Sequence, residues 1–142
     1  MCQACIKTGE HHFLVLTFVS RTAESTTPAT DVSGWKGTLA YYVACLFLRA
    51  LAHQRGRTFI RHVEANSWMF SQSDLMPITS SYRSLEERSR NARYDGKQFN
   101  RLKLQEVADW YDQVMDLLVS LLKSAGLAGA IKPDVRRWLL YI

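Results

Sequence analysis

The sequence predicts an all-α fold, an up-and-down bundle of four to five helices preceded by a short irregular N-terminal extension. Apolar residues recur at helical spacing through three long stretches, residues 35–54, 78–92 and 104–125. The apolar fraction of 47% supplies a core. With 142 residues the chain has the size of one domain, and no internal repeat divides it.

The first part of the chain differs from the rest in composition. Residues 20–33 are rich in Ser and Thr and contain Pro28, which is typical of a linker. Before them, residues 13–19 form a β-like apolar run. We therefore divide the chain into an N-terminal extension and linker, residues 1–33, and a helical-bundle domain, residues 34–142.

Each helix of the bundle is expected from its apolar period and its end signals. The expected helices span residues 35–54, 59–70, 77–94 and 104–125, with one more short helix in the tail, residues 132–142. Gly56 and Gly126 are expected to end the first and fourth of them, because glycine adopts the left-handed conformation that closes many helices. Pro77 suits the start of the third, where its missing N–H costs nothing.

The charge and the cysteines limit the classes of partner and compartment. Eighteen Lys and Arg against thirteen Asp and Glu give a net charge of +5, which favours RNA or a nucleotide as ligand. No stretch approaches the roughly 20 apolar residues that span a bilayer, so we expect no membrane partner. Three cysteines cannot all pair within one chain, which fits free thiols and a cytoplasmic location.

One segment resembles a metal site. Cys2-x-x-Cys5, followed by His11 and His12, carries the thiol and imidazole ligands that zinc prefers. No second pair of ligands follows it, and chain termini are commonly unliganded and frayed, so we favour that interpretation. The sequence also lacks a phosphate-binding glycine loop and a nucleophile elbow. We expect no metal and no cofactor.

Arginines gather on the third expected helix. Arg83–Glu87 and Glu86–Arg90 have the spacing of ion pairs on a solvated helix face, which accounts for part of the run. The cations toward its end outnumber the nearby acids. We therefore predict a binding face for RNA or a nucleotide there, with a further cation at the start of the second helix; its residues are Arg90, Arg93, Tyr94, Asp95 and Arg61.

A second interpretation is that the chain is an enzyme. Arg57 and His62 lie five residues apart, and an arginine holding a phosphate beside a histidine that moves a proton would cleave RNA without metal. These two are weak catalytic candidates, because a solvated loop ahead of a helix explains the same spacing. A third interpretation is a purely structural helical interaction protein with no nucleic-acid ligand.

Two apolar residues of the fourth helix lie off its main stripe. Trp110 and Leu117 need cover of their own, since a monomer would leave them exposed. We therefore predict a homodimer that uses both.

Three segments together resemble the HEPN-domain family. Residues 35–51, with the paired Tyr41 and Tyr42, resemble its first long helix, and Arg61-His62-Val63 resembles the Thr-His step that opens the next segment. Residues 81–95, with Arg90-Asn91-Ala92-Arg93-Tyr94-Asp95, are similar to its third helix. The resemblance covers about residues 35–125.

The resemblance implies a helical bundle, commonly dimeric, that works with a nucleotidyltransferase partner or as a ribonuclease in toxin–antitoxin and defence systems. The family's ribonuclease signature is an arginine followed four to six residues later by a histidine, near the end of the third helix. Here Arg90 begins such a motif, but no histidine follows through Lys97, and the Arg57–His62 pair lies in another element. The departure favours a non-catalytic, RNA- or nucleotide-binding member.

Overall fold

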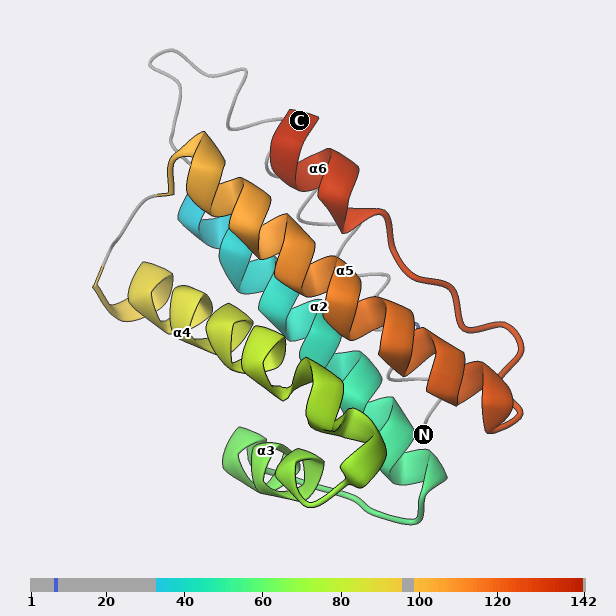
Figure 1. Cartoon of the computed structure of the whole chain (residues 1–142). Helices are drawn as coiled ribbons and strands as arrows, with labels where there is room; N and C mark the ends of the chain where they lie inside the picture. Colours follow the sequence, from blue (N-terminus) through green and yellow to red (C-terminus); the bar gives the residue numbers. More distant parts are fainter. Residues whose placement is uncertain (1–6, 8–32, 96–98, 142) are drawn as a thin grey trace.

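The computed structural model describes residues 7, 33–95 and 99–141, and over them the fold is all-α with no strand (Figure 1). The predicted fold class is confirmed. The β-like run of residues 13–19 and the Cys2, Cys5, His11 and His12 segment lie outside the described residues. The elements are α2 (Ser33–Gln54), α3 (His62–Phe70), the 3-10 helix η1 (Ser73–Ile78), α4 (Thr79–Tyr94), α5 (Arg101–Ser124) and α6 (Val135–Tyr141).

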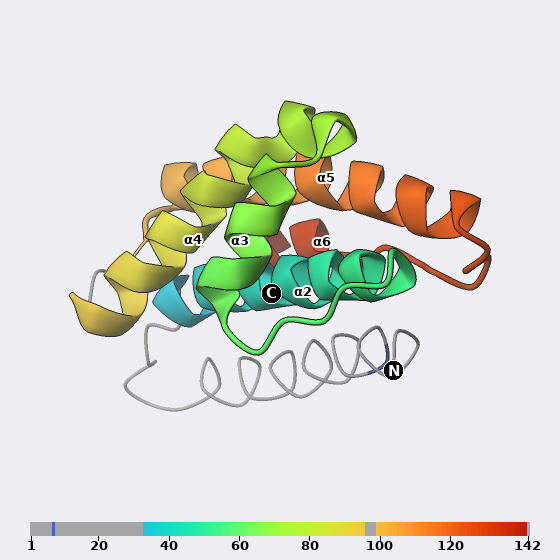
Figure 2. The same ribbon diagram turned by 90° about the horizontal axis from the view of Figure 1, so that it is seen from below.

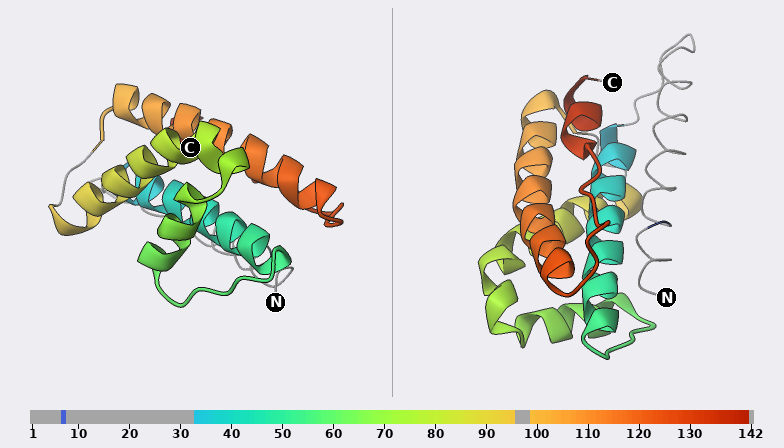
Figure 3. Two further views of the ribbon diagram at one scale, coloured as in Figure 1. Left: turned by 60° about the horizontal axis from the view of Figure 1, so that its bottom comes forward. Right: turned by 90° about the vertical axis from the view of Figure 1, so that its right-hand side faces the viewer.

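Three long helices form the body of the bundle. Helices α2, α4 and α5 pack on one another, and each runs opposite to the one before it (Figure 1). The short α3 crosses below α2 and α4, as the view from below shows (Figure 2). Helix α6 packs on α5 and touches α2 (Figure 3). In Figure 1 it lies on the opposite side of α5 from α4.

Helix α2 is buried on most of its sides, because apolar residues occupy more than one of its faces. Residues from Leu39 to Ala52 are almost all under 3% exposed, and Arg49 is the one charged residue among them. The helix ends where Gly56 adopts a φ of 74°, as predicted. Charged side chains are rarely buried unless they are paired, so Arg49 in this apolar stretch should have polar or charged partners.

Helix α3 begins at His62, three residues later than the predicted start at Phe59. The side chain of Glu64 accepts a hydrogen bond from the Arg61 backbone N–H at 3.3 Å and another from Arg61 Nε at 2.9 Å. The first bond satisfies a backbone N–H that the helix itself leaves without a partner, and the second holds the Glu64 carboxylate in place, so together they fix the start. Phe59 stays in the preceding loop, where its ring packs against Trp68.

The remaining helices largely follow the predicted periods. Pro77 lies inside η1 and α4 begins just after it, at Thr79. Helix α5 starts at Arg101, three residues before the predicted Leu104, because the Asn100 side chain accepts the Lys103 backbone N–H at 3.0 Å. Gly126, with a φ of 95°, follows its end as predicted.

The tail forms α6 and is held on α5 by ion pairs. Arg136 Nη1 lies 2.7 Å from Asp109 and 2.9 Å from Asp112, and Lys132 Nζ lies 3.1 Å from Asp112 and 2.7 Å from Asp116. The predicted final helix is thereby confirmed. None of the described helices combines the length and the apolar content needed to cross a bilayer.

Candidate functional site

Polar side chains gather where α2, α3 and α4 meet, at a place we call the junction. Helical spacing puts them on facing sides, since residues three, four and seven positions apart share a face. The pairs Cys45–His62 and Asn66–Glu86 join α3 to α2 and to α4. The junction residues are Tyr41, Tyr42, Cys45 and Arg49 of α2, His62 and Asn66 of α3, and Tyr82, Glu86, Ser89 and Arg93 of α4.

Cys45 and His62 form a hydrogen-bonded pair, with Sγ 3.1 Å from Nδ1. Burial raises the pKa of the Cys45 thiol, and burial together with the charge of Arg49 lowers the pKa of His62. At neutral pH both shifts favour a thiol beside a neutral imidazole over the thiolate–imidazolium pair in which a cysteine acts as a nucleophile.

Arg93 lies between two tyrosines at the outer edge of the junction. Its Nη1 donates a hydrogen bond to the Tyr42 hydroxyl at 2.7 Å, and its Nε donates to the Ser89 carbonyl at 3.3 Å. Its guanidinium carbon lies 5.3 Å from the centroid of the Tyr42 ring and 5.2 Å from that of Tyr94. A guanidinium over an aromatic ring is a favourable cation–π arrangement, so Arg93 is fixed in place while still exposed.

His62 and Arg93 meet on the same ring, that of Tyr42. The centroid of the His62 ring lies 6.0 Å from that of Tyr42, edge-on, and the charge of Arg93 contributes to lowering the pKa of His62. The predicted proton-transfer histidine and a predicted phosphate-binding arginine, distant in sequence, therefore share one site. His62 lies in α3, outside the α4 segment that carries the family's motif, and it still comes next to Arg93 because both contact the Tyr42 ring.

The other predicted residues differ in where the structure places them. Arg90 is exposed one turn before Arg93 and forms no ion pair with a described residue. Arg61 is held by Glu64, with Nη2 2.9 Å from the carboxylate. Asp95 caps the end of α4, where its N–H bonds to the Asn91 carbonyl. Arg93, Tyr94 and Arg90 thus form a continuous surface, and Arg61 is engaged locally.

Arg57 is not brought into the junction. It lies in the loop after α2, where its backbone N–H donates to the Ala52 carbonyl at 2.9 Å. Its exposed side chain makes no hydrogen bond or ion pair with the residues that the structure describes. The predicted pairing of Arg57 with His62 has no contact to support it, and Arg49 and Arg93 are the arginines beside His62.

Glu86 is the acidic residue that faces these cations. Both of its carboxylate oxygens accept hydrogen bonds from Asn66 Nδ2, each at 3.0 Å, and its charge partly opposes the lowering of the His62 pKa. The predicted Glu86–Arg90 ion pair is therefore absent among the described contacts, because Glu86 turns inward to α3.

The junction also holds polar atoms that no hydrogen bond satisfies. Among the described residues, the buried side-chain atoms without a hydrogen-bond partner are Arg49 Nε, Asn66 Oδ1, Tyr82 Oη and Ser89 Oγ. All four belong to the junction residues. Such atoms are rare in protein interiors and call for an explanation such as water or a functional role. Because all four lie in the junction, the junction is the candidate functional site among the described residues.

Sequence reasoning missed Cys45 and Arg49 of α2, Asn66 of α3 and Glu86 of α4 as members of this site. Arg49 and Cys45, one helical turn apart in an apolar helix, carried a signal, because a charge within such a stretch needs partners. The sequence gives no signal that Asn66 and Glu86 belong to the site, since their contact depends on how α3 crosses α4. Within the described residues, no group of three or more His, Cys, Asp or Glu side chains is placed to hold a metal ion.

The predicted dimer residues are half-buried in the monomer. Trp110 lies under Arg88, whose guanidinium carbon is 5.6 Å from the centroid of a Trp110 ring, and Arg88 is held by Glu106 at 3.0 Å. Leu117 packs partly against the core. Contacts within the monomer therefore cover part of the surface of Trp110 and Leu117. The dimer stays a prediction.

Comparisons with models of known protein families, with curated proteins and with solved structures found no match to this chain. The resemblance to HEPN-domain proteins therefore rests on the sequence pattern alone.

Proposed function

We propose that the chain is a HEPN-like helical module that binds RNA or nucleotides through the outer edge of the junction, without cutting them. The observation that carries this proposal is Arg93, stacked between Tyr42 and Tyr94 and exposed at its outer side. A guanidinium has five N–H donors, and the bonds to Tyr42 and Ser89 use two. The remaining N–H donors can bind phosphate oxygens, which arginine contacts through paired donors.

The neighbouring charges add to this site. Arg49 and Arg93 both act on His62, and Arg90 stands one turn from Arg93 on the exposed surface of α4. Glu86 is tied to Asn66 and only partly offsets them. The exposed ring of Tyr94 offers a surface on which a base can stack. Surfaces that bind single-stranded nucleic acids combine cations, which contact the phosphates, with aromatic rings, on which the bases stack.

The proton chemistry of the junction supports binding without cutting. Cleaving RNA at the ribose 2′-OH needs one group to take a proton and one to give a proton to the leaving oxygen. His62 has one ring nitrogen, Nδ1, engaged by Cys45, which leaves Nε2. Burial raises the pKa of Tyr41 and Tyr82, so neither serves as a base at neutral pH. One proton-transfer nitrogen supports binding better than turnover.

Fluorescence anisotropy with a labelled single-stranded RNA tests the proposal. We expect the parent to bind and Arg93→Ala to bind at least fivefold more weakly, since a hydrogen bond to a charged group is worth about 1.5–3 kcal/mol. Arg137→Ala is the matched control, because Arg137 is an exposed arginine of α6, on the other side of α5 from α4. If both variants lost the same RNA affinity, the loss would come from the change in net charge alone, which would contradict the proposed site.

A metal-independent endoribonuclease is the second candidate, and one observation favours it. His62 and Arg93 lie on the same Tyr42 ring, so a phosphate held by Arg93 would bring the ribose close to a neutral imidazole. RNA cleavage in EDTA that is lost in His62→Ala and retained in Arg137→Ala would establish this candidate. A positioned general base or acid typically contributes 10²–10⁴ in rate, so the loss would be plain.

The partners belong to the same proposal. The HEPN-like pattern supports a homodimer, a nucleotidyltransferase partner and a role in a toxin–antitoxin or defence pair in the cytoplasm. Where a nucleotidyltransferase gene neighbours the gene for this chain, co-expression of the two products followed by affinity purification tests the partner. A chain that binds neither RNA nor such a partner would instead fit the third interpretation, a structural interaction protein.

A further inference from the structure

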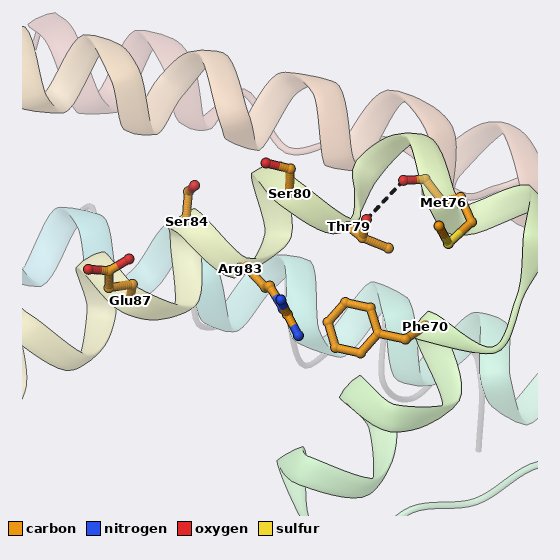
Figure 4. Close-up of a pocket in the computed structure, with 7 residues that line it drawn as sticks. All are labelled: Phe70, Met76, Thr79, Ser80, Arg83, Ser84 and Glu87. Carbon is orange, nitrogen blue, oxygen red and sulfur yellow. Dashed lines mark hydrogen bonds between the residues drawn. The ribbon is translucent and has the colours of Figure 1, made fainter.

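A pocket of about 460 Å³ opens on the surface where α3 ends and α4 begins. Phe70 from α3 and Met76 from η1 supply its apolar side, and Ser80, Arg83 and Ser84 of α4 supply polar groups (Figure 4). The pocket is distinct from the junction, since it shares no residue with it. None of the residues predicted from the sequence as a binding site lies in it.

The guanidinium of Arg83 lies over the Phe70 ring in the pocket wall. The guanidinium carbon of Arg83 lies 4.3 Å from the centroid of the Phe70 ring, and Figure 4 shows the two side chains next to each other. The predicted Arg83–Glu87 ion pair does not form among the described contacts. Planar arginine and aromatic surfaces are those on which unpaired RNA bases stack.

The hydrogen-bonding groups around this pair suit the edge of a base. Ser80 and Ser84, one turn apart on α4, make no hydrogen bond with a described residue, so both hydroxyls can donate and accept. The carboxylate of Glu87 also lines the pocket. A negative carboxylate disfavours a phosphate in this position, while it accepts a hydrogen bond from a base amino group. The lining therefore selects a base over a phosphate.

The pocket lies on the same exposed stripe of α4 as the proposed phosphate-binding surface. Arg83, Glu87, Arg90 and Tyr94 follow one another at steps of four, three and four residues, which is one helix face. At 1.5 Å per residue, Arg83 and Tyr94 are separated by roughly 16 Å along the helix. A chain whose phosphates lie at Arg90 and Arg93 can therefore run along α4 and reach the pocket.

From these observations we infer that the ligand is single-stranded RNA and that the Phe70–Arg83 pocket receives one of its unpaired bases. The inference rests on the proposed RNA-binding function and names the form of RNA. A duplex cannot enter the pocket in this way, because its bases are stacked and paired inside the helix. The binding surface thus consists of phosphate contacts at the end of α4 and a base contact near its start.

Arg83→Lys is the variant that separates stacking from charge, since lysine keeps the charge and loses the planar group. Anisotropy titrations would compare a labelled single-stranded RNA with the same strand in a duplex. We expect the parent to prefer the single strand and Arg83→Lys to bind it roughly fivefold or more weakly, because a stacked base is worth about 1–3 kcal/mol. The salt dependence should stay as in the parent. Arg137→Lys is the matched control.

The outcomes separate this inference from the proposed function. A parent that binds RNA while Arg83→Lys and Phe70→Leu bind equally well would overturn the base pocket and leave the phosphate surface standing. Equal affinity of the parent for single strand and duplex would also overturn it. A parent that binds no RNA would remove the proposed function and the pocket with it. Phe70 packs partly on the core, so if Phe70→Leu does not fold, the exposed Arg83→Lys decides alone.

Discussion

The Sγ atom of Cys45 lies 3.1 Å from Nδ1 of His62, and this contact ties the first residue of α3 to the middle of α2. Cys45 is 2% exposed, whereas His62 is exposed at its outer side. The thiol therefore anchors the imidazole from within the fold. With Nδ1 engaged, Nε2 is the ring nitrogen left for any ligand.

The first prediction concerns the reactivity of Cys45. Burial raises its pKa, so at pH 7.5 its thiolate fraction should be smaller than that of an ordinary cysteine. We expect iodoacetamide to modify Cys45 more slowly than it modifies glutathione, as measured by mass spectrometry of the peptide that contains residue 45. In His62→Ala the rate should not fall. A slower reaction in that variant would mean that His62 stabilises a thiolate, contrary to the neutral pair.

The second prediction concerns stability and pH. The folded-state pKa of His62 is lowered by burial and by the charges of Arg49 and Arg93, against the opposing charge of Glu86. The unfolded chain, with an ordinary histidine pKa near 6.5, then binds the proton more readily. The contribution of His62 to stability should be complete above about pH 6.5 and be lost as the pH falls toward its lower folded-state pKa.

Urea denaturation between pH 7.5 and pH 5.5 measures this effect. The free energy of unfolding should fall across that range in the parent and fall less in His62→Gln. His53→Gln serves as the control for replacing a histidine near the end of α2. A parent whose stability rises on acidification would show that the sign of the shift is wrong.

The third prediction compares two buried tyrosines. The Tyr82 hydroxyl lies close to the Cys45 thiol and the Tyr41 hydroxyl but forms no well-aligned hydrogen bond with either, whereas the Tyr111 hydroxyl donates to the Pro133 carbonyl at 3.2 Å. Removing the first should change the free energy of unfolding by less than about 0.5 kcal/mol or stabilise the fold, and removing the second should cost about 1 kcal/mol. Thermal denaturation of Tyr82→Phe and Tyr111→Phe measures both. A larger loss in Tyr82→Phe would show that its hydroxyl does bond, to Cys45, to Tyr41 or to a bound water.

Helix existence could be predicted from local sequence, while helix starts depended on particular contacts. The period of α5 and the glycines after α2 and α5 were sufficient to predict those elements. The start of α3 was misplaced, because the apolar residues Phe59 and Ile60 extend the pattern while Glu64 caps the helix at Arg61. A carboxylate three residues after an arginine did not stand out as a capping signal.

The candidate site could be predicted only in part. Arg93 and Tyr94 were recognised because charge gathers locally at the end of α4. Their combination with His62 could not be, since it depends on the angle at which α3 crosses α2. The Phe70–Arg83 contact was missed for a related reason. A local ion pair with Glu87 satisfied the pattern, but the turn through η1 brings Phe70 beside Arg83 instead.

The fourth prediction concerns the homodimer. Trp110 and Leu117 are half-buried on α5, and a partner would complete their cover. Light scattering of the Trp110→Asp/Leu117→Asp variant should give a monomer where the parent is a dimer, with circular dichroism as the control for folding. A parent that is already monomeric contradicts the prediction.

The central claim is that cations at the end of α4 bind RNA phosphates, and the salt dependence of binding tests it most directly. The measurement is the slope of log Kd against log salt for a single-stranded RNA, for the parent, His62→Ala and Arg90→Ala/Arg93→Ala. We predict a steep parent slope, reduced by about one unit for each lost phosphate contact in the double variant and nearly unchanged in His62→Ala. A double variant with the slope and affinity of the parent would contradict the account.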